Sequence, residues 1–548
     1  MPNTLEDMLV DRKLLSRDQL RDAAKRARAG GKSLTATLVE EQVIAERDLL
    51  DAAAAHQGIP LVELKEMALD ERAVRRVSAK LVSHYFVAPL KLENGVLTLA
   101  VCDPMDMAAI EDIETDLGVR VERVLATRED IAAVIRRHYG VGADTVERIV
   151  EGLDRAEDTH VEDGSHDLGR MAQDVSVVRL VNQLLDQAIK ERTTDVHLEV
   201  YRGEVVARRR IDGVLYDTPV PRDINVLYPA IVSRIKLMAG LNIVERRMPQ
   251  DGRTRVKVDD AQYDLRISVV PSIHGENLVI RILPTQMLFG LDRLGLSAAA
   301  RKQMESLMSL PHGIVFVTGP TGSGKSTTLY ACLRKLNTRE RKIITIEDPV
   351  EYELRGAVQT QINPKIGLTF AHALRSMLRH DPDVMMVGEV RDVETAAIAV
   401  QTALTGHLVL STLHTNDAAG GAIRLLDMGL DPYLIASTVR AFVAQRLVRV
   451  VCSACKEGYE QDGKTLYRGR GCPQCAKTGY RGRTGIYECL VVGEEARALI
   501  LARSSAAALR EKATALGMRT LAEDGWDKVS AGITTADEVL RVTRMGQG

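Results

Sequence analysis

The stretch that decides the fold is Gly319-Pro320-Thr321-Gly322-Ser323-Gly324-Lys325-Ser326. It matches the pattern G-x4-G-K-[ST], whose glycines let backbone N–H groups turn inward around phosphate oxygens. The apolar residues 314–318 before it predict a strand, and residues 327–336 after it predict a helix. A chance glycine-rich turn rarely stands between such a strand and such a helix. The pattern therefore predicts a phosphate-binding loop at a helix N-terminus, where the partial positive charge favours anions.

Particular chemistry is expected of two residues in this loop. Lys325 should reach the β- and γ-phosphates of ATP, and Ser326 should ligate Mg²⁺. The other residues should contribute mainly backbone groups. The expected nucleotide-binding set is Gly319, Pro320, Thr321, Gly322, Ser323, Gly324, Lys325, Ser326 and Thr327.

Short apolar runs at residues 343–346, 384–387 and 408–412 alternate with helical patterns, which favours a parallel sheet covered on both faces. Acidic residues follow two of these runs: Glu347 and Glu351 after the first, and Glu389 after the second. In an open α/β sheet the ligand lies at the carboxyl ends of the strands. Both acidic clusters are therefore expected to meet at the phosphate loop. Ordinary solvation of strand ends is the alternative.

Two histidines flank the strand expected at residues 408–412: His407 precedes it and His414 follows it. Each could sense a phosphate or carry a proton. A lone histidine is more often structural, so both interpretations stay open on spacing alone.

Residues from about 174 to 485 resemble the GspE/PilB family, the assembly ATPases of type II secretion and type IV pili. The matching blocks are residues 248–253, 319–326, 347–352, 378–392, 405–417 and 444–449. The resemblance implies a RecA-like core in a homohexamer, with nucleotide held between two domains and completed by a neighbour. It implies that Glu351 activates water, with Glu347 as second candidate. It also places Glu389 in the Walker B block, positioning Mg²⁺ or water, and His407 and His414 in the His box.

Four arginines are also implicated by this resemblance. Arg266 and Arg281 match positions that contact nucleotide phosphates from the preceding domain. Arg375 and Arg379 lie one helical turn apart and should share a face. An arginine supplied from another domain can stabilise developing phosphate charge. A surface salt bridge is the alternative for each.

Four of the seven cysteines form two pairs, Cys452-x2-Cys455 and Cys472-x2-Cys475. Each pair can hold one ion from a tight turn, and four thiolates complete a closed structural tetrahedron. An Fe–S cluster and unligated thiols are the alternatives. The resemblance implies a zinc-binding insertion here.

The first residues contain a repeat with an offset of 29, which predicts two similar helical hairpins packed on each other. Residues 80–140 then predict a small α+β module with an Asn94-Gly95 hairpin turn. Residues 1–140 resemble the N-terminal (MshEN) domain of the same family, some of which bind cyclic di-GMP. Those that do bind it resemble one another in a paired helical motif that contains Arg-Leu-Gly. The arginine and glycine of this motif are missing from both repeats, at residues 4–6 and 33–35. We therefore expect a docking module for protein partners, with cyclic di-GMP unlikely.

Residues 144–174 carry ten acidic and three basic residues, which predicts a flexible linker; a solvated helix fits part of it. The fold class expected is α/β: a RecA-like core with an α+β N-terminal module, a second α+β domain, a zinc-binding insertion and C-terminal helices. The expected divisions are 1–140 (docking), 141–174 (linker), 175–288 (arginine-supplying domain), 289–450 (ATPase core), 451–485 (tetracysteine region) and 486–548 (C-terminal helices).

The composition narrows the choice of partners. The net charge of −2 and the aromatic content of 3% disfavour nucleic acid, and no apolar run reaches about 18 residues, so no membrane span is expected. We expect a cytoplasmic ATPase, peripheral at the inner membrane through platform and anchoring proteins, that powers pseudopilus assembly and protein export. A type IV pilus extension ATPase is the near alternative. A nucleic-acid translocase and a regulator without turnover are more distant ones.

Overall fold

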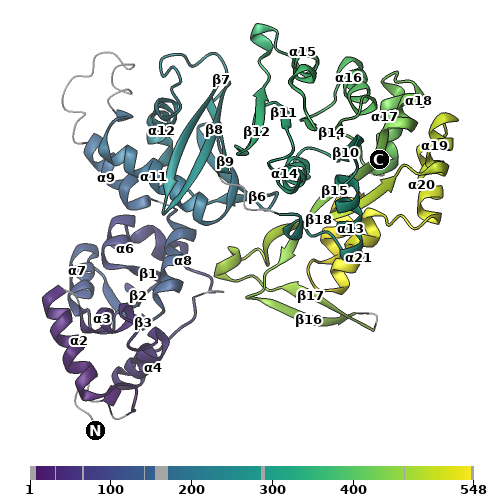
Figure 1. Ribbon diagram of the computed structural model, residues 1–548. Helices are drawn as coiled ribbons and strands as arrows, with labels where there is room; N and C mark the ends of the chain where they lie inside the picture. The colour runs from purple at the N-terminus through teal and green to yellow at the C-terminus, as the bar shows by residue number, and fades with distance from the viewer. Residues whose placement is uncertain are drawn as a thin grey trace. The chain divides into compact units, whose positions relative to one another are not determined.

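The chain divides into two units, Met1–Leu283 and Pro284–Gly548. Figure 1 shows them in a computed structural model, coloured along the chain. The residues described are 8–10, 12–30, 33–64, 67–140, 142–154, 171–221, 223–285, 290–461 and 463–544.

The first unit begins with short helices: α2 (Arg17–Gly30), α3 (Leu34–Glu40) and α4 (Glu46–Gln57). The two halves of the repeat start their second helices differently. Ser16 Oγ accepts a hydrogen bond from the Gln19 N–H at 3.2 Å, whereas Ala45 offers α4 no side-chain cap. Capping preferences predict this difference, because a serine oxygen can satisfy an orphan N–H and a methyl group cannot.

A three-stranded sheet follows, in the order β1 (Val87–Glu93), β2 (Val96–Val101) and β3 (Arg120–Leu125). Strands β1 and β2 form the predicted hairpin. Asn94 and Gly95 both have positive φ, 50° and 79°, as a two-residue type I′ turn requires. The helices that accompany this sheet are α5 (Glu71–Arg76), α6 (Ala79–Tyr85), α7 (Met107–Leu117) and α8 (Arg128–His138).

The acidic segment differs from its predicted form. Its first part is helix α9 (Ala143–Asp154), so the flexible form is wrong there, and the alternative of a helix over residues 146–153 is confirmed. Val146 is buried among the apolar side chains of the next domain, and Glu147 accepts a hydrogen bond from the Lys80 N–H at 2.7 Å. The burial of one apolar stripe holds this otherwise acidic helix in place. Residues 155–170 of the proposed linker lie outside the described residues.

A six-stranded sheet of order β6-β5-β4-β9-β8-β7 completes the first unit. Helix α12 begins before Pro229, and Leu227 and Tyr228 in its first turns are buried. The strands are β4 (Thr193–Tyr201), β5 (Glu204–Ile211), β6 (Val214–Thr218), β7 (Gln250–Val258), β8 (Ala261–Ser272) and β9 (Gly275–Pro284), and the helices are α11 (Val175–Lys190) and α12 (Ile224–Met238).

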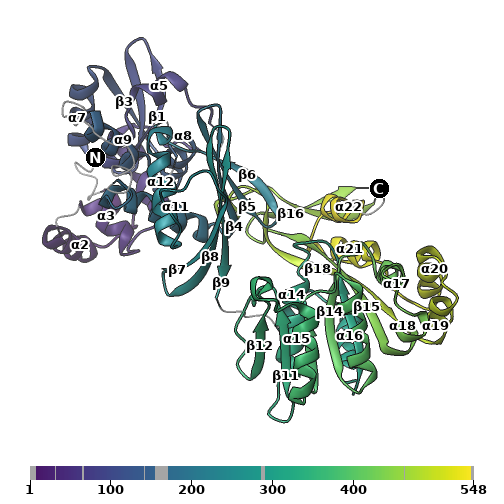
Figure 2. The same ribbon diagram turned by 90° about the horizontal axis from the view of Figure 1, so that it is seen from above.

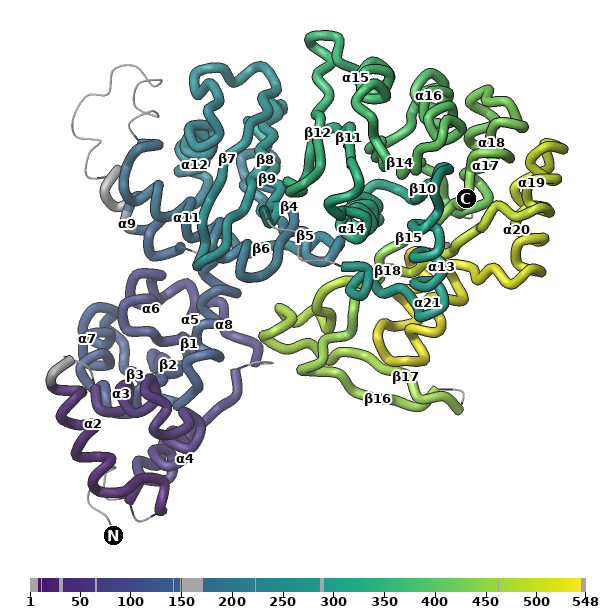
Figure 3. The backbone as a smooth tube through the Cα atoms, viewed as in Figure 1, coloured from purple at the N-terminus to yellow at the C-terminus, as the bar shows by residue number. Residues whose placement is uncertain are grey.

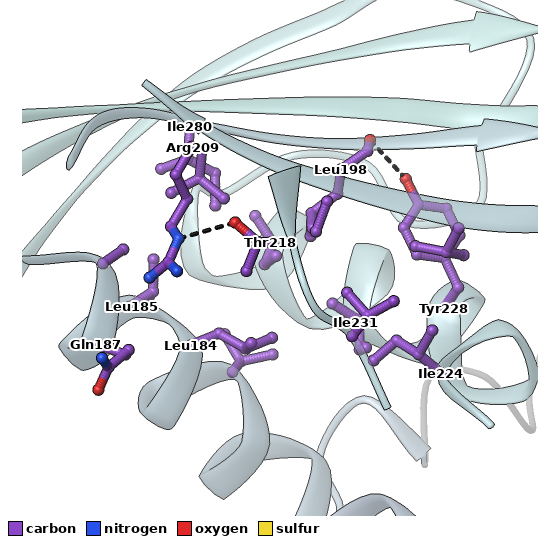
Figure 4. A pocket seen from close by; sticks show the side chains of 17 residues that line it. Leu184, Leu185, Gln187, Leu198, Arg209, Thr218, Ile224, Tyr228, Ile231 and Ile280 are labelled. Carbon is purple, nitrogen blue, oxygen red and sulfur yellow. Dashed lines mark hydrogen bonds between the residues drawn. The ribbon is translucent and has the colours of Figure 1, made fainter. Parts of the chain in front are cut away.

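Between this sheet and its helices lies an apolar pocket, shown in Figure 4. Arg209 points into it from β5 and donates to Thr218 Oγ1 at 2.8 Å, and it also pairs with Glu191. Burial lowers the pKa of Arg209, which its carboxylate partner opposes. Tyr228 closes another side by donating its hydroxyl to the Leu198 carbonyl at 3.0 Å. The pocket is therefore part of the packed interior of this domain.

The second unit is built on a seven-stranded sheet of order β12-β11-β13-β14-β10-β15-β18. The strands from β12 to β15 are parallel, and β18 runs antiparallel to β15. They are β10 (Gly313–Thr318), β11 (Ile343–Glu347), β12 (Ala357–Gln361), β13 (Val384–Val387), β14 (Leu408–Leu413), β15 (Val439–Val451) and β18 (Tyr480–Val491).

Helices cover both faces of this sheet, as Figure 2 shows for α14 (Lys325–Leu336) and α16 (Val393–Leu404). Alternate residues of β10 enter different cores: Ile314 and Phe316 join one cluster, and Val315 and Val317 join the other. Every residue of β10 is buried in consequence. This explains why its sequence is an unbroken apolar run.

The C-terminal residues contain helices, but they start later than predicted. Strand β18 runs to Val491, so residues 486–491 belong to the sheet and the expected helical region begins at α19. A two-stranded ribbon, β16 (Lys456–Gln461) with β17 (Lys464–Gly469), lies beside α21 (Figure 3). The helices are α13 (Ala298–Met308), α15 (Phe370–Met377), α17 (Ala418–Asp427), α18 (Pro432–Thr438), α19 (Glu494–Leu501), α20 (Ala506–Ala515), α21 (Leu521–Ser530) and α22 (Ala536–Arg544).

Within the described ranges, no helix combines the length and the apolar character needed to cross a bilayer.

Candidate active site and metal centre

The predicted phosphate loop connects β10 to α14. Gly319, Gly322 and Gly324 have φ values of 147°, 79° and 88°, which side chains with a Cβ rarely adopt. The loop also presses against β15. A Cβ on Gly319 would lie 2.6 Å from the Gln445 carbonyl oxygen, and one on Gly324 would lie 2.7 Å from Gln445 Nε2. Glycine is therefore required for both the backbone conformation and the close approach.

Lys325 lies over this loop. Its Nζ donates to the carbonyl oxygens of Gly319 at 2.8 Å and Pro320 at 3.0 Å. Burial lowers the pKa of Lys325 to about 8; the positive charge of Arg446 acts in the same direction, and Glu389 opposes it. The ammonium group is thus bonded in this loop by neutral carbonyl oxygens, and no carboxylate of the loop neutralises it. Its positive charge is therefore available to an incoming phosphate.

Glu389 and His414 lie together at the carboxyl edge of the sheet. Glu389 follows β13 and accepts from His414 Nε2 at 3.3 Å and from Arg391 Nε at 2.8 Å. Strand β13 lies two places from β10 in the sheet, and the charge of Glu389 raises the pKa of Lys325 against the effect of burial. A carboxylate and an imidazole at this edge can hold a metal-bound or attacking water in place.

Glu347 is placed differently from Glu389. It is 3% exposed, and its carboxylate accepts hydrogen bonds from Tyr330 at 2.5 Å, Thr345 at 2.6 Å and Gln359 at 3.2 Å. These bonds join β11 to α14 and β12, so Glu347 is occupied by packing rather than presented to water. Glu351 lies four residues further along and is half-buried, in the segment between β11 and β12. Of the two candidates, Glu351 is the better placed to meet a ligand.

His407 lies at the opposite edge of the sheet. It precedes β14, whose first residue, Leu408, pairs with Gly313, while the phosphate loop follows the last residue of β10. The six residues of β14 separate the two edges by about 20 Å. Its Nδ1 is 2.9 Å from the Thr402 carbonyl and 3.2 Å from Thr405 Oγ1. Within one chain, the structure does not bring His407 to the phosphate loop.

Arg375 and Arg379 lie on the surface of the second unit. Arg375 pairs with Glu394 of α16 at 2.7 Å, and Arg379 donates to the Arg375 carbonyl at 3.2 Å. Helix α15 ends at Met377, so Arg379 sits in a following 3₁₀ turn and not on a continuous helix face. Both arginines therefore have partners that are common for exposed arginines, a carboxylate for Arg375 and a backbone carbonyl for Arg379.

Arg266 and Arg281 line one depression of the first unit, on strands β8 and β9. Arg281 pairs with Asp195 at 2.9 Å. A third arginine, Arg253, lines the same depression and sits opposite Arg266 in the β7–β8 register. Asp251 also lines the depression, but three guanidinium groups outnumber this one carboxylate and make the surface attractive to anions. Sequence analysis did not single out Arg253, although it ends the block 248–253 that resembles the family.

The four predicted cysteines converge. Their Sγ atoms all lie within 4.8 Å of one another. The separations are 3.8 Å for Cys452–Cys472, 3.9 Å for Cys455–Cys475 and 3.7 Å for Cys472–Cys475. A tetrahedron with Zn–S bonds of about 2.3 Å has edges of about 3.8 Å. The four thiolates thus fit a structural zinc ion. When bound, the metal would link the end of β15, the β16–β17 ribbon and the start of β18.

A phosphate loop on a mostly parallel sheet, with a lysine, a carboxylate and a histidine at one edge, defines a P-loop nucleoside triphosphatase. Comparison with known proteins narrows this class. The family described as "Type II/IV secretion system protein" matches residues 170–541, and the MshEN domain matches residues 57–145. The chain belongs to the type II/IV secretion system protein family, and it is a secretion ATPase of that family.

Individual relatives agree with this assignment. The type II secretion system protein E of Xanthomonas campestris is 42% identical over 98% of both chains. The type IV pilus assembly ATPase PilB of Myxococcus xanthus is 40% identical over 98% of this chain and 99% of that one. Among solved structures, the ATPase DotB of Legionella pneumophila matches with a TM-score of 0.53 and 25% identity, covering 66% of this chain and 95% of its own.

Proposed function

We propose that this ATPase is a type II secretion motor that hydrolyses ATP to power pseudopilus assembly and protein export. The carrying observation is the cradle around Lys325, with Glu389 and His414 at the same sheet edge. Relatives described as type II secretion system proteins, 42% identical over nearly the whole chain in one case, support this branch. We also propose a homohexamer, as is usual for such ATPases.

The site residues take distinct roles in this proposal. Backbone groups of residues 319–327 and the Lys325 ammonium bind the phosphates. Ser326 and Glu389 would hold Mg²⁺, which neutralises phosphate charge when it is bound. Glu351 takes the proton of the attacking water, and His414 orients Glu389 through their contact.

The arginines complete the site from elsewhere. Arg253, Arg266 and Arg281 form an anion-attracting face on the first unit, suited to stabilising phosphate charge when that face meets a nucleotide. Arg375 and Arg379 are exposed on the second unit and can serve a neighbouring subunit. Hydrolysis would then be coupled to the movement of one unit against another.

The tetracysteine cluster is proposed to bind zinc. Its sulfur separations match a Zn tetrahedron. Two of the cysteines precede β16 and two follow β17, at the end of the ribbon where Lys456 pairs with Gly469. One zinc ion per chain is therefore expected by elemental analysis. Iron in place of zinc, or no metal in freshly purified protein, would refute this assignment.

We propose that residues 1–140 dock a protein partner, which keeps a cytoplasmic motor at the inner membrane. Ser33 and Thr35, where the second cyclic di-GMP motif would lie, both donate to the Asp103 carboxylate, at 2.7 and 2.8 Å. That carboxylate would repel a phosphate, which supports the view that cyclic di-GMP is not a ligand. The first motif position, residues 4–6, lies outside the described residues. Nucleic acid is not proposed as a partner.

A type IV pilus extension ATPase is the second candidate, because the Myxococcus relative is nearly as similar. Deletion of the gene separates the two. Loss of secreted enzymes with intact surface pili supports the secretion motor, and loss of pili with intact secretion supports the pilus motor. Each phenotype should be restored by the wild-type gene and not by the Lys325→Ala form.

A further inference from the structure

Gln445 and Arg446 lie on β15 directly behind the phosphate loop. Gln445 Oε1 accepts from Thr328 Oγ1 of α14 at 2.7 Å, and its carbonyl oxygen faces Gly319. Arg446 is 7% exposed, and a Cβ on Gly319 would lie 3.2 Å from its Nη1. A buried guanidinium therefore lies close behind Gly319 of the loop that binds phosphate, although Arg446 itself has no bonded carboxylate in the described structure.

The same guanidinium holds a second loop. Arg446 Nη2 donates to the carbonyl oxygen of Asn416 at 3.0 Å and to its Oδ1 at 3.2 Å, while Nη1 reaches the Gln445 carbonyl at 3.4 Å. Residue 416 lies two positions after His414, the imidazole that contacts Glu389. Arg446 thus lies close to Gly319 of the phosphate loop and donates hydrogen bonds to the segment that carries this imidazole.

Residues 414–418, called the sensor segment here, are also held from the other side. Asp417 caps α17 by accepting from the Gly420 N–H at 2.7 Å, and its carboxylate pairs with Arg510 of α20. Glu488 accepts from the Ala418 N–H at 2.9 Å and from the Leu521 N–H at 3.4 Å. The sensor segment is therefore held by Arg446 on one side and by contacts with α20 and β18 on the other.

We propose that Arg446 is a positioning residue for hydrolysis, which fixes the sensor segment so that His414 and Glu389 face the nucleotide held by Lys325. A planar guanidinium suits this task because its fixed fork donates from Nη2 to Asn416 and from Nη1 to the Gln445 carbonyl, which faces Gly319. A lysine would keep the positive charge but offers one ammonium, which cannot make both of these contacts in the same geometry. Charge alone therefore does not replace Arg446.

A purely structural role of Arg446 predicts a lower melting temperature when it is replaced, whereas a positioning role predicts a lower kcat at an unchanged melting temperature. The test measures both quantities. We would compare Arg446→Lys, Asn416→Ala and the double variant by ATP turnover, with kcat and KM measured separately and melting temperature alongside. Arg440→Lys is the matched control, since Arg440 is on the same strand but contacts the His312 carbonyl, 3.4 Å away, before β10 begins.

We expect Arg446→Lys to lower kcat about tenfold, with KM within about threefold and an almost unchanged melting temperature. Asn416→Ala removes only the 3.2 Å bond to Oδ1 and keeps the 3.0 Å bond to the backbone carbonyl, so it should lower kcat less. The double variant should be no worse than Arg446→Lys, because both changes act on the same contact. Arg440→Lys should behave as wild type. Equal kcat for wild type and Arg446→Lys, or losses that multiply in the double variant, would overturn the proposal. A wild-type chain without turnover would instead count against ATP hydrolysis itself.

Discussion

Glu347 and Glu351 lie four residues apart, and exchanging each carboxylate for an amide should have opposite consequences. Glu347→Gln keeps the shape but replaces an acceptor-only group by one that must also donate. Three donors, from Tyr330, Thr345 and Gln359, already point at it. In the variant, the hydrogen bonds to this buried group become weaker, and the new amide N–H group faces one of the existing donors. Together these changes should lower the free energy of unfolding by on the order of 3 kcal/mol.

Glu351→Gln should leave stability within about 0.5 kcal/mol, because this side chain is only half-buried. Its effect should appear in turnover, lowered by about 10²–10⁴-fold if Glu351 takes the proton of the attacking water. Denaturant unfolding and phosphate release would be measured on both variants. Glu353→Gln, exposed two residues further on, is the control and should change neither quantity. A fully stable Glu347→Gln protein without turnover, beside an active Glu351→Gln protein, would refute this division of roles.

Three further results are expected. Since burial lowers the pKa of Lys325 to about 8, ATP binding should take up a proton above that pH. The ATP affinity should then fall up to about tenfold per pH unit, and Lys325→Arg should flatten this dependence in nucleotide titrations. Cys455→Ser should abolish stoichiometric zinc and lower the melting temperature, whereas Cys102→Ser should keep the metal; equal zinc in both would count against the site. Although burial opposes it, hydrogen bonds from Arg541 and Arg449 lower the pKa of Glu538 to about 2. This pairing stabilises the fold above about pH 4.5 and is lost as the pH falls toward 2, so the deficit of Glu538→Gln, about 3 kcal/mol at pH 7, should vanish in acid unfolding.

The features that sequence predicted well are those with local causes. The phosphate loop, the Asn94-Gly95 turn and the buried β10 follow from backbone geometry and from burial on two faces. The cysteine pairs likewise predicted their own convergence, because two tight turns gripping one ion need little knowledge of the rest of the fold.

The features that could not be predicted from the sequence depend on contacts between residues that lie far apart in the chain. Spacing placed Glu347 and Glu389 equally at strand ends, but the burial of Glu347 depends on Tyr330 and Gln359 from other elements. His407 looked as suitable as His414 until the strand register put it at the opposite sheet edge. Arg446 lies in the block 444–449 that resembles the family, but sequence analysis assigned it no role, since its contacts with Asn416 and its place behind Gly319 arise only in the folded sheet.

The most direct test of ATP-driven function is phosphate release by the purified chain with Mg²⁺ and ATP, compared among wild type, Lys325→Ala and Glu389→Gln. We expect steady release from wild type, no ATP binding by Lys325→Ala, and ATP binding without release by Glu389→Gln. Release at the wild-type rate from either variant would contradict the assignment of the site.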